Sequence, residues 1–281
     1  MTAFVLTFSC ADEPGIVAHV ANHIFASGGN ILESSQYNDR ETGRFFLRIG
    51  FVLADPAREG GMRSGFATLV TRFAMTATLR AANERPKVVI LVSKFDHCLV
   101  DLLYRQRIGE LDMDIAAIVS NHPLNGFDPG DVPFHYLPIA AATKADQEAS
   151  VWDIVEAGRA DLVILARYMQ VLSDDLSAKL GGKCINIHHS FLPGFKGAKP
   201  YHQAHVRGVK LIGASAHYVT GDLDDGPIIE QDVERISHAD TADDLIRKGR
   251  DIERRVLSRA VALHLDGRVA INGGRTVVFR D

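Results

Sequence analysis

The polar side chains best suited to chemistry lie together in residues 186–190, which read Asn-Ile-His-His-Ser. Asn186 and His188 are two residues apart at the end of an apolar run, so on a strand both side chains would point to the same side. An amide can donate a hydrogen bond to a developing oxyanion, and an imidazole can transfer protons near neutral pH. The spacing therefore indicates a catalytic pair facing one cleft, although two side chains packed into a core would show the same spacing.

A second polar stretch supplies carboxylates. Residues 224–227 read Asp-Asp-Gly-Pro, a composition typical of a tight turn. A carboxylate on such a turn can orient a histidine, favour its protonated form and hold a water molecule. We expect Asp224 to act in this way on His188. Two solvated turn residues are the alternative, because the sequence spacing does not itself bring Asp224 to His188.

Histidines are concentrated in the same part of the chain, where five of the twelve fall between residues 188 and 217. Such a cluster suggests a metal site. None of the five lies in a His-Glu-x-x-His pattern, and His202 and His205, three residues apart, have no obvious third ligand. We therefore expect no metal.

The composition excludes several classes of protein. With 46% hydrophobic and 23% charged residues among 281, the chain resembles an ordinary globular protein, and its net charge of −4 does not favour nucleic acid or membrane as partners. No apolar stretch approaches the roughly 20 residues that cross a bilayer, and no signal peptide is apparent. Cys10, Cys98 and Cys184 are far apart and predict reduced thiols, so we expect a cytoplasmic protein.

The chain divides near residue 85 into two predicted domains. Residues 1–85 contain no lysine, and the first lysine is Lys87. Apolar spacing in residues 1–85 predicts a β-α-β-β-α-β order, which is the arrangement of ferredoxin-like domains. Asp12 is the predicted cap of the first helix. The predicted elements cover residues 2–9, 16–25, 31–38, 44–54, 60–74 and 76–82.

Residues 86–281 show a different pattern, in which continuous apolar strands alternate with helices. This pattern predicts a Rossmann-like α/β domain with a mostly parallel sheet and with ligands at the carboxyl ends of its strands. The predicted strands cover residues 88–93, 114–120, 161–166, 210–220 and 228–235, and the predicted helices lie around 99–103, 146–158 and 241–263.

Three separated blocks of this second domain occur in a specific order: residues 167–173 (RYMQVLS), 186–193 (NIHHSFLP) and 224–227 (DDGP). Together they resemble the catalytic core of the folate-dependent formyltransferase family. The resemblance implies that Asn186, His188 and Asp224 form a catalytic triad. It also implies a folate pocket, with His189 where a transferase admits its amine acceptor; the residues assigned to substrate binding are Arg167, Tyr168, Met169, Val171, Leu172 and His189.

The loop at residues 92–99 distinguishes branches of this family. It reads Val-Ser-Lys-Phe-Asp-His-Cys-Leu and contains no glycine, so it cannot cradle a nucleotide phosphate as the glycine-rich loop of a transferase does. It resembles the deformylase branch, which also has His-His-Ser at residues 188–190 and an N-terminal ACT domain. The implied reaction is hydrolysis of 10-formyltetrahydrofolate to tetrahydrofolate and formate, which serves purine synthesis and one-carbon balance. The folate is the substrate, so no separate cofactor is expected.

Two other functions stay open. Formyl transfer to an amine such as glycinamide ribonucleotide would use the same triad. A catalytically silent amino-acid sensor would retain the scaffold, but the intact Asn186, His188 and Asp224 argue against it.

ACT domains commonly bind amino acids between copies, so the resemblance implies a homo-oligomer and an amino-acid effector. Asp12, Gly15, Ile16 and Asn30 are the expected effector residues, because backbone amides at a helix start can hold a carboxylate. A domain that only assembles the oligomer is the alternative.

Overall fold

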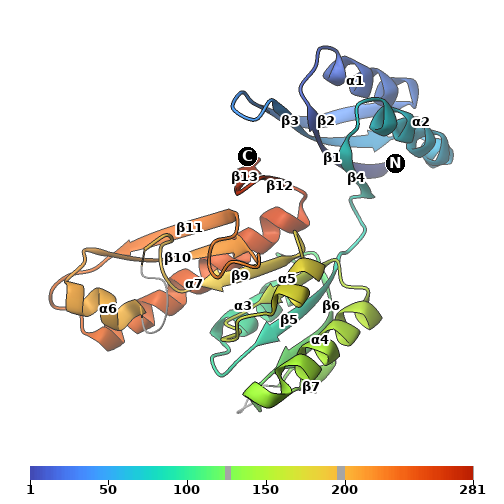
Figure 1. Ribbon diagram of the computed structural model, residues 1–281. Coiled ribbons are helices and arrows are strands. Elements are labelled where there is room, and N and C mark those ends of the chain that lie inside the picture. Colours follow the sequence, from blue (N-terminus) through green and yellow to red (C-terminus); the bar gives the residue numbers. More distant parts are fainter. Residues whose placement is uncertain (124–127, 195–199, 281) are drawn as a thin grey trace. The chain divides into compact units, whose positions relative to one another are not determined.

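The computed structural model describes residues 1–123, 128–194 and 200–280, which form two compact units (Figure 1). The first unit contains Met1–Glu84, Asp266–Asn272 and the chain from Thr276 onward. The second contains Arg85–Leu265 and Gly273–Arg275. No helix in these described ranges has the length and apolar character needed to cross a membrane.

The first unit is built on an antiparallel sheet with the strand order β2-β3-β1-β4. The predicted β-α-β-β-α-β order is present. Phe4, Leu6 and Phe8 alternate along β1 and join Ile24 and Phe66 of the two helices in one core, as a sheet covered on one face requires. The elements are β1 (Thr2–Ala11), α1 (Ile16–Ala26), β2 (Gly29–Asp39), β3 (Arg44–Leu53), the 3₁₀ helix η1 (Pro56–Arg58), α2 (Glu59–Arg72) and β4 (Thr76–Ala81).

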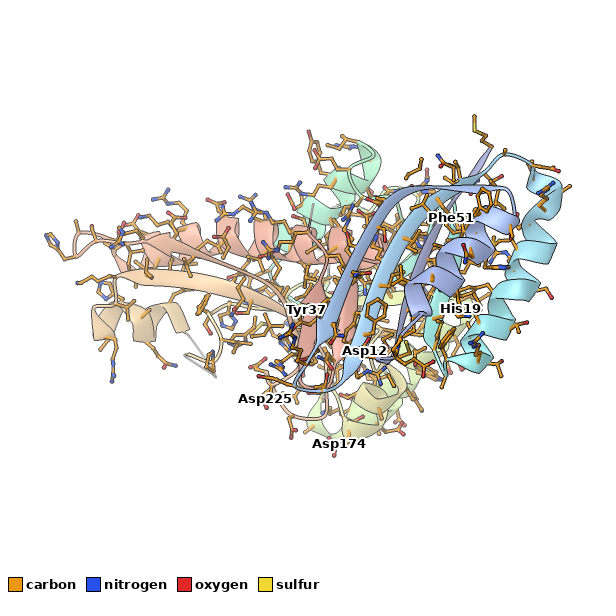
Figure 2. The ribbon with its side chains drawn as sticks, turned by 90° about the horizontal axis from the view of Figure 1, so that it is seen from above. Asp12, His19, Tyr37, Phe51, Asp174 and Asp225 are labelled. Carbon is orange, nitrogen blue, oxygen red and sulfur yellow. The ribbon has the colours of Figure 1, made fainter. Side chains whose placement is uncertain are left out.

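The prediction that Asp12 caps the first helix is wrong. The cap position of α1 is Gly15, with φ 94°, and no side chain caps the helix. Asp12 instead accepts a hydrogen bond from Asn38 Nδ2 at 2.5 Å, so its carboxylate ties the end of β1 to β2. Figure 2 marks Asp12 and, on α1, His19.

The C-terminal hairpin consists of β12 (Val269–Asn272) and β13 (Arg275–Val278). Its place in the fold differs from the predicted division of the chain into domains. The sequence assigns all residues after 85 to one domain, whereas most of this hairpin belongs to the first unit. Asn272 Nδ2 donates to Asp39 Oδ2 at 2.5 Å, and Arg48 Nε donates to the Asp266 carbonyl at 3.1 Å. These polar contacts join the last residues of the chain to the first sheet.

The second unit contains a seven-stranded sheet with the order β11-β10-β9-β8-β5-β6-β7. The strands from β9 to β7 are parallel, and β10 and β11 are antiparallel, so the predicted α/β class with a mostly parallel sheet is confirmed. The strands are β5 (Lys87–Val92), β6 (Asp114–Ser120), β7 (Phe134–Tyr136), β8 (Leu162–Leu165), β9 (Cys184–His188), β10 (Leu211–Tyr218) and β11 (Ile228–Arg235).

The helices of this unit include three that the sequence pattern predicts and two short ones that it does not, α5 and α6. They are α3 (His97–Arg107), α4 (Lys144–Gly158), α5 (Asp174–Lys179), α6 (Pro200–Arg207) and α7 (Ala242–Leu265), with a 3₁₀ turn η2 at Ala141–Thr143. Helices of six to eight residues are too short to give a convincing apolar period, which explains why they escape prediction.

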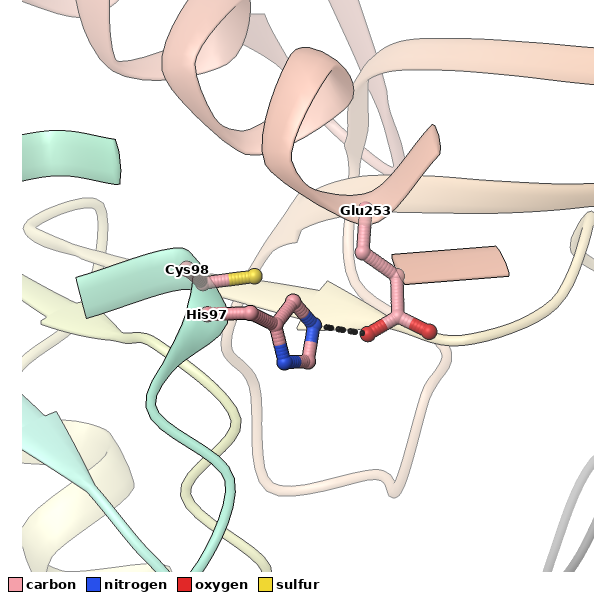
Figure 3. Close-up of side chains that lie close together, drawn as sticks. All are labelled: His97, Cys98 and Glu253. Atoms are coloured by element: carbon pink, nitrogen blue, oxygen red, sulfur yellow. Dashed lines mark hydrogen bonds and ion pairs between the residues drawn. The ribbon is translucent and has the colours of Figure 1, made fainter. Parts of the chain in front are cut away.

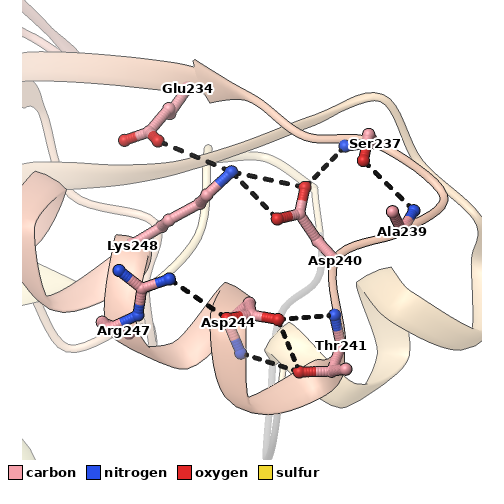
Figure 4. Close-up of polar contacts among 8 residues, drawn as sticks. All are labelled: Glu234, Ser237, Ala239, Asp240, Thr241, Asp244, Arg247 and Lys248. Carbon is pink, nitrogen blue, oxygen red and sulfur yellow. Dashed lines mark hydrogen bonds and ion pairs between the residues drawn. The ribbon is translucent and has the colours of Figure 1, made fainter.

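Helix α7 is fixed at its start by reciprocal hydrogen bonds (Figure 4). The Asp244 carboxylate accepts from the Thr241 backbone at 3.0 Å, and the Thr241 hydroxyl accepts from the Asp244 backbone at 3.2 Å. This is a capping box, which satisfies amides that the first turn leaves without partners. An ion pair of Lys248 with Asp240, at 3.1 Å, adds to it and anchors the helix that carries Glu253.

Candidate active site

The carboxyl ends of β8 and β9 border a cavity of about 260 Å³ in the second unit. Parallel strands end at the same edge of a sheet, which is where α/β domains place their ligands. All nine residues predicted for catalysis and substrate binding line this one cavity: Asn186, His188, Asp224, Arg167, Tyr168, Met169, Val171, Leu172 and His189.

His188 and Asp224 are in direct contact. His188 Nδ1 lies 3.2 Å from Asp224 Oδ2, and the two side chains are 5% and 10% exposed. A carboxylate only accepts, so Nδ1 carries the proton and Nε2 presents its lone pair. Nε2 is buried and has no hydrogen-bond partner within the described ranges. This leaves it available to take a proton from a molecule bound in the cavity.

The turn that delivers Asp224 depends on a left-handed backbone and on a glycine. Asp224 has φ 53°, an uncommon conformation that aspartate tolerates better than most residues. A Cβ atom on Gly226 would lie 1.8 Å from the Tyr218 carbonyl oxygen, so only glycine fits there. Tyr218 N also donates to the Pro227 carbonyl at 3.0 Å, and this hydrogen bond holds the turn close to the end of β10.

His217 is a site residue that the sequence analysis did not select. Its Nδ1 donates to the Tyr218 carbonyl at 2.9 Å, so its Nε2 can accept from Asn186 Nδ2, which lies 3.2 Å away. The antiparallel register of β9 and β10 pairs Asn186 with His217 directly. One N–H of the Asn186 amide is thereby used, and the second remains for a substrate oxygen. Only the strand register, which the sequence does not specify, would have identified His217.

The charges in the cavity follow from these contacts. Burial alone would raise the pKa of Asp224, but the hydrogen bond from His188 outweighs it and holds that pKa well below its ordinary value. Burial, reinforced by the charge of Arg167, lowers the pKa of His189 to about 3. Asp224 is therefore an anion at neutral pH, and His189 is a neutral ring.

Residues 167–172 form one wall of the cavity with both buried and exposed side chains. Met169 and Val171 are 51% and 52% exposed and give the wall an accessible apolar surface. Tyr168 and Leu172 are buried in the core beneath the sheet, and Gln147 donates to the Tyr168 hydroxyl at 2.9 Å. Tyr168 and Leu172 therefore anchor the wall in the core, while Met169 and Val171 are accessible to a ligand.

Glu253, on α7, is the centre of a second buried cluster that the sequence analysis missed (Figure 3). Its Oε2 lies 2.9 Å from His97 Nε2 and 3.2 Å from Arg167 Nε, and its Oε1 accepts from the Tyr201 hydroxyl at 2.6 Å. His97 and Glu253 are 156 positions apart in the chain, so no local motif signals the cluster.

His97, Cys98 and Glu253 offer three ligand atoms within 4.8 Å of one another. Their chemistry does not favour a metal. Burial raises the pKa of the Cys98 thiol well above its ordinary value, which disfavours the thiolate that a metal would need. The Arg167 guanidinium, 3.2 Å from Glu253 Oε2, already compensates the charge of that carboxylate.

The predicted effector residues do not all come together. Asp12, Gly15 and Ile16 line a hollow of about 450 Å³ in the first unit, together with Phe45. Asn30 pairs in register with Val52, which lies opposite Ala3 at the other end of β1 from Ala11. The distance along the strand is about 27 Å, so Asn30 cannot share that hollow within one copy of the chain.

Comparisons with known proteins identify relatives of this chain. A family model described as formyl transferase matches residues 86–261. A formyltetrahydrofolate deformylase of Corynebacterium sp. (strain P-1) is 47% identical over 280 residues, covering 98% of each chain. The crystal structure of a formyltetrahydrofolate deformylase from Burkholderia mallei ATCC 23344 has a TM-score of 0.95 and 51% identity, with full coverage of both chains.

A glycinamide ribonucleotide transformylase from Symbiobacterium toebii is also similar, with a TM-score of 0.65 and 27% identity. That similarity covers 98% of the transformylase but only 72% of this chain. The similarity to the deformylases, in contrast, runs through both units. The chain therefore belongs to the formyl transferase family and, within it, to the formyltetrahydrofolate deformylases.

Proposed function

We propose that this protein hydrolyses 10-formyltetrahydrofolate to tetrahydrofolate and formate. The observation that carries the proposal is the His188–Asp224 pair, whose Nε2 is unpartnered in the same cavity as the Asn186 amide. A polarised carbonyl next to a proton acceptor is the arrangement that amide hydrolysis needs. The full-length similarity to deformylases supports hydrolysis over transfer to an amine.

In this mechanism His188 Nε2 takes a proton from a water molecule, and the resulting hydroxide adds to the formyl carbon. The carbonyl oxygen becomes an oxyanion, which accepts a hydrogen bond from the free N–H of Asn186. The protonated His188 then gives its proton to the folate nitrogen as the carbon–nitrogen bond breaks. The formic acid then loses its proton to His188 Nε2, which passes it to solvent, so formate is the anion that leaves and the enzyme ends each turnover unchanged.

Asp224 and His217 support these two groups. The Asp224 carboxylate stabilises the imidazolium form of His188 and keeps its ring oriented, as the acid of a catalytic triad does. His217, held by the Tyr218 carbonyl, fixes the Asn186 amide with its nitrogen toward the ring. The substrate is itself the folate, so the reaction as written uses no further cofactor.

The wall at residues 167–172 is our candidate for the pterin-binding surface. The exposed side chains of Met169 and Val171 would contact the ring, and backbone groups would supply hydrogen bonds, as in other largely apolar ligand sites. Met169 N is itself held by the Ser93 hydroxyl at 2.9 Å, which ties the wall to the end of β5.

Three single substitutions test the assignment: Asn186→Ala, His188→Ala and Asp224→Ala. Each variant is purified, its fold is checked by circular dichroism, and formate release from 10-formyltetrahydrofolate is measured. We expect all three to lose most turnover. Folded variants that retain wild-type rates would show that the triad lies elsewhere.

For the first unit we propose an ACT-like role, in which an amino acid binds at Asp12, Gly15 and Ile16. The acidic side chains of Asp12 and Glu13 suit the ammonium end of a zwitterion, and the backbone amides at the start of α1 suit its carboxylate end. Thermal shifts of the full chain with glycine or methionine, compared with those of Ile16→Lys, test this role. Identical thermal shifts of the wild type and the variant on addition of the amino acid would rule out this hollow as its binding site.

We also propose that the protein is a homo-oligomer in the cytoplasm. Phe25 and Leu32 of the first unit are 79% and 64% exposed, so an interface between copies would bury apolar surface, and β2 is an edge strand open to pairing. All three cysteines are free and buried, which fits a reducing compartment. Light scattering of the wild type and Leu32→Lys tests the assembly; two monodisperse monomers would refute it.

A further inference from the structure

Arg167 is the one arginine or lysine among the described residues that line the active-site cavity. Its side chain is 9% exposed, and its backbone has φ 65°. Its Nη1 is buried and has no hydrogen-bond partner within the described ranges. A buried guanidinium N–H without an acceptor is rare in a native protein, so this atom points to a group that binds there.

Glu253 fixes the guanidinium without satisfying it. Arg167 Nε lies 3.2 Å from Glu253 Oε2, an ion-pair distance, although the N–H is not aligned well enough for a hydrogen bond. Both carboxylate oxygens already have donors, since His97 approaches Oε2 and the Tyr201 hydroxyl donates to Oε1. The ion pair therefore holds Arg167 in place while Nη1 stays available to another acceptor.

His189 and Asp224, which line the cavity together with Arg167, do not attract an anion. His189 is neutral because burial and the charge of Arg167 lower its pKa. Asp224 is negatively charged and is already engaged with His188. The proposed hydrolysis nevertheless creates a new anion beside these residues, because the formyl carbon leaves as a carboxylate.

We propose that Arg167 binds the formate product, a one-carbon carboxylate that accepts a hydrogen bond from Nη1. This inference rests on the proposed hydrolysis. A guanidinium binds a carboxylate through charge-assisted hydrogen bonds, which are about twice as strong as neutral ones. In this role Arg167 draws the product away from the Asp224 carboxylate, and Glu253 is a positioning residue that holds the guanidinium through their ion pair.

The test measures binding of ¹³C-formate to the purified full chain by NMR line broadening. Arg167→Lys keeps the positive charge but removes the planar guanidinium group and its fixed set of N–H donors. The double variant Arg167→Met/Glu253→Gln removes both charges, so that no buried charge is left unpaired. Arg105→Gln, at a partly buried ion pair with Asp101 on α3, is the control. We expect formate affinity to fall about tenfold or more in both Arg167 variants and to be unchanged in the control.

Formate binding of wild-type strength in either folded Arg167 variant would overturn the inference. A crystal structure of the wild type grown with formate decides the matter without any variant: an anion on Arg167 supports the inference, and an anion elsewhere or no anion overturns it. Formate release from 10-formyltetrahydrofolate by the wild type is measured separately. If that release is absent, the proposed hydrolysis fails; if it is present while Arg167 does not affect formate binding, only this inference fails.

Discussion

The substitution Gly226→Ala tests whether the position of Asp224 controls catalysis. The new Cβ atom would lie 1.8 Å from the Tyr218 carbonyl oxygen, whereas ordinary contacts begin near 3.4 Å. The turn must therefore move by about 1.6 Å, a shift of the size that is enough to disrupt a catalytic constellation. Asp224 is two residues away, so its 3.2 Å contact with His188 cannot survive that movement unchanged.

The expected loss follows from the contact that breaks. A hydrogen bond to a charged group contributes about 1.5–3 kcal/mol, and each 1.4 kcal/mol of barrier is tenfold in rate. We therefore expect kcat to fall by about 10- to 150-fold. The substrate wall at residues 167–172 has anchors outside this turn, in Gln147 and Ser93, so KM should change less than kcat.

The assay is formate release by the purified variant, with circular dichroism and urea unfolding to establish that it is folded. Gly60→Ala is the control, because a methyl group added at that position of α2 meets no atom within 4 Å. It should retain wild-type kcat. A folded Gly226→Ala protein with kcat within about twofold of the wild type would refute the assigned role of Asp224.

Three further predictions concern the oxyanion, the buried cluster and pH. Asn186→Ala should lower kcat by about 10²–10³ in the formate assay, because it removes the oxyanion donor; a smaller effect on kcat than on KM would contradict this role. Gly249→Ala should lower the urea-unfolding free energy by about 1–3 kcal/mol, because its Cβ would lie 2.1 Å from the Tyr201 ring, whereas Gly60→Ala should raise it slightly; a gain in both would refute the packing argument. Because the pKa of His189 falls from 6.5 to about 3 on folding, its contribution to stability is complete above pH 6.5 and is lost toward pH 3, by up to about 1.4 kcal/mol per pH unit. His189→Gln should remove that slope in urea unfolding measured across this range, and equal slopes in both proteins would contradict it.

The sequence predicted the class of the fold and the strand that carries the central pair. Period-two spacing places Asn186 and His188 on the same side of β9, and continuous apolar runs predict the buried strands. These signals are local, so they can be read without knowing the fold. The family, inferred from three separated motifs, is confirmed by full-length relatives.

Features that depend on long-range register could not be predicted. His217 reaches Asn186 only because β9 and β10 pair antiparallel in one register. Glu253 meets His97 through the packing of α7 against α3, which leaves no trace in the spacing of either residue. Asp12 looked like a helix cap because its type and position suit one, but a tertiary hydrogen bond to Asn38 takes its carboxylate.

In the proposed reaction water, not an amine, accepts the formyl group in the cavity around His188. The most direct measurement supplies purified wild-type protein with 10-formyltetrahydrofolate, with and without glycinamide ribonucleotide, and quantifies formate and tetrahydrofolate. The mechanism predicts that both products appear in equal amounts without any amine and that the amine does not become formylated. Formyl transfer that requires the amine, or no turnover in either condition, would contradict it.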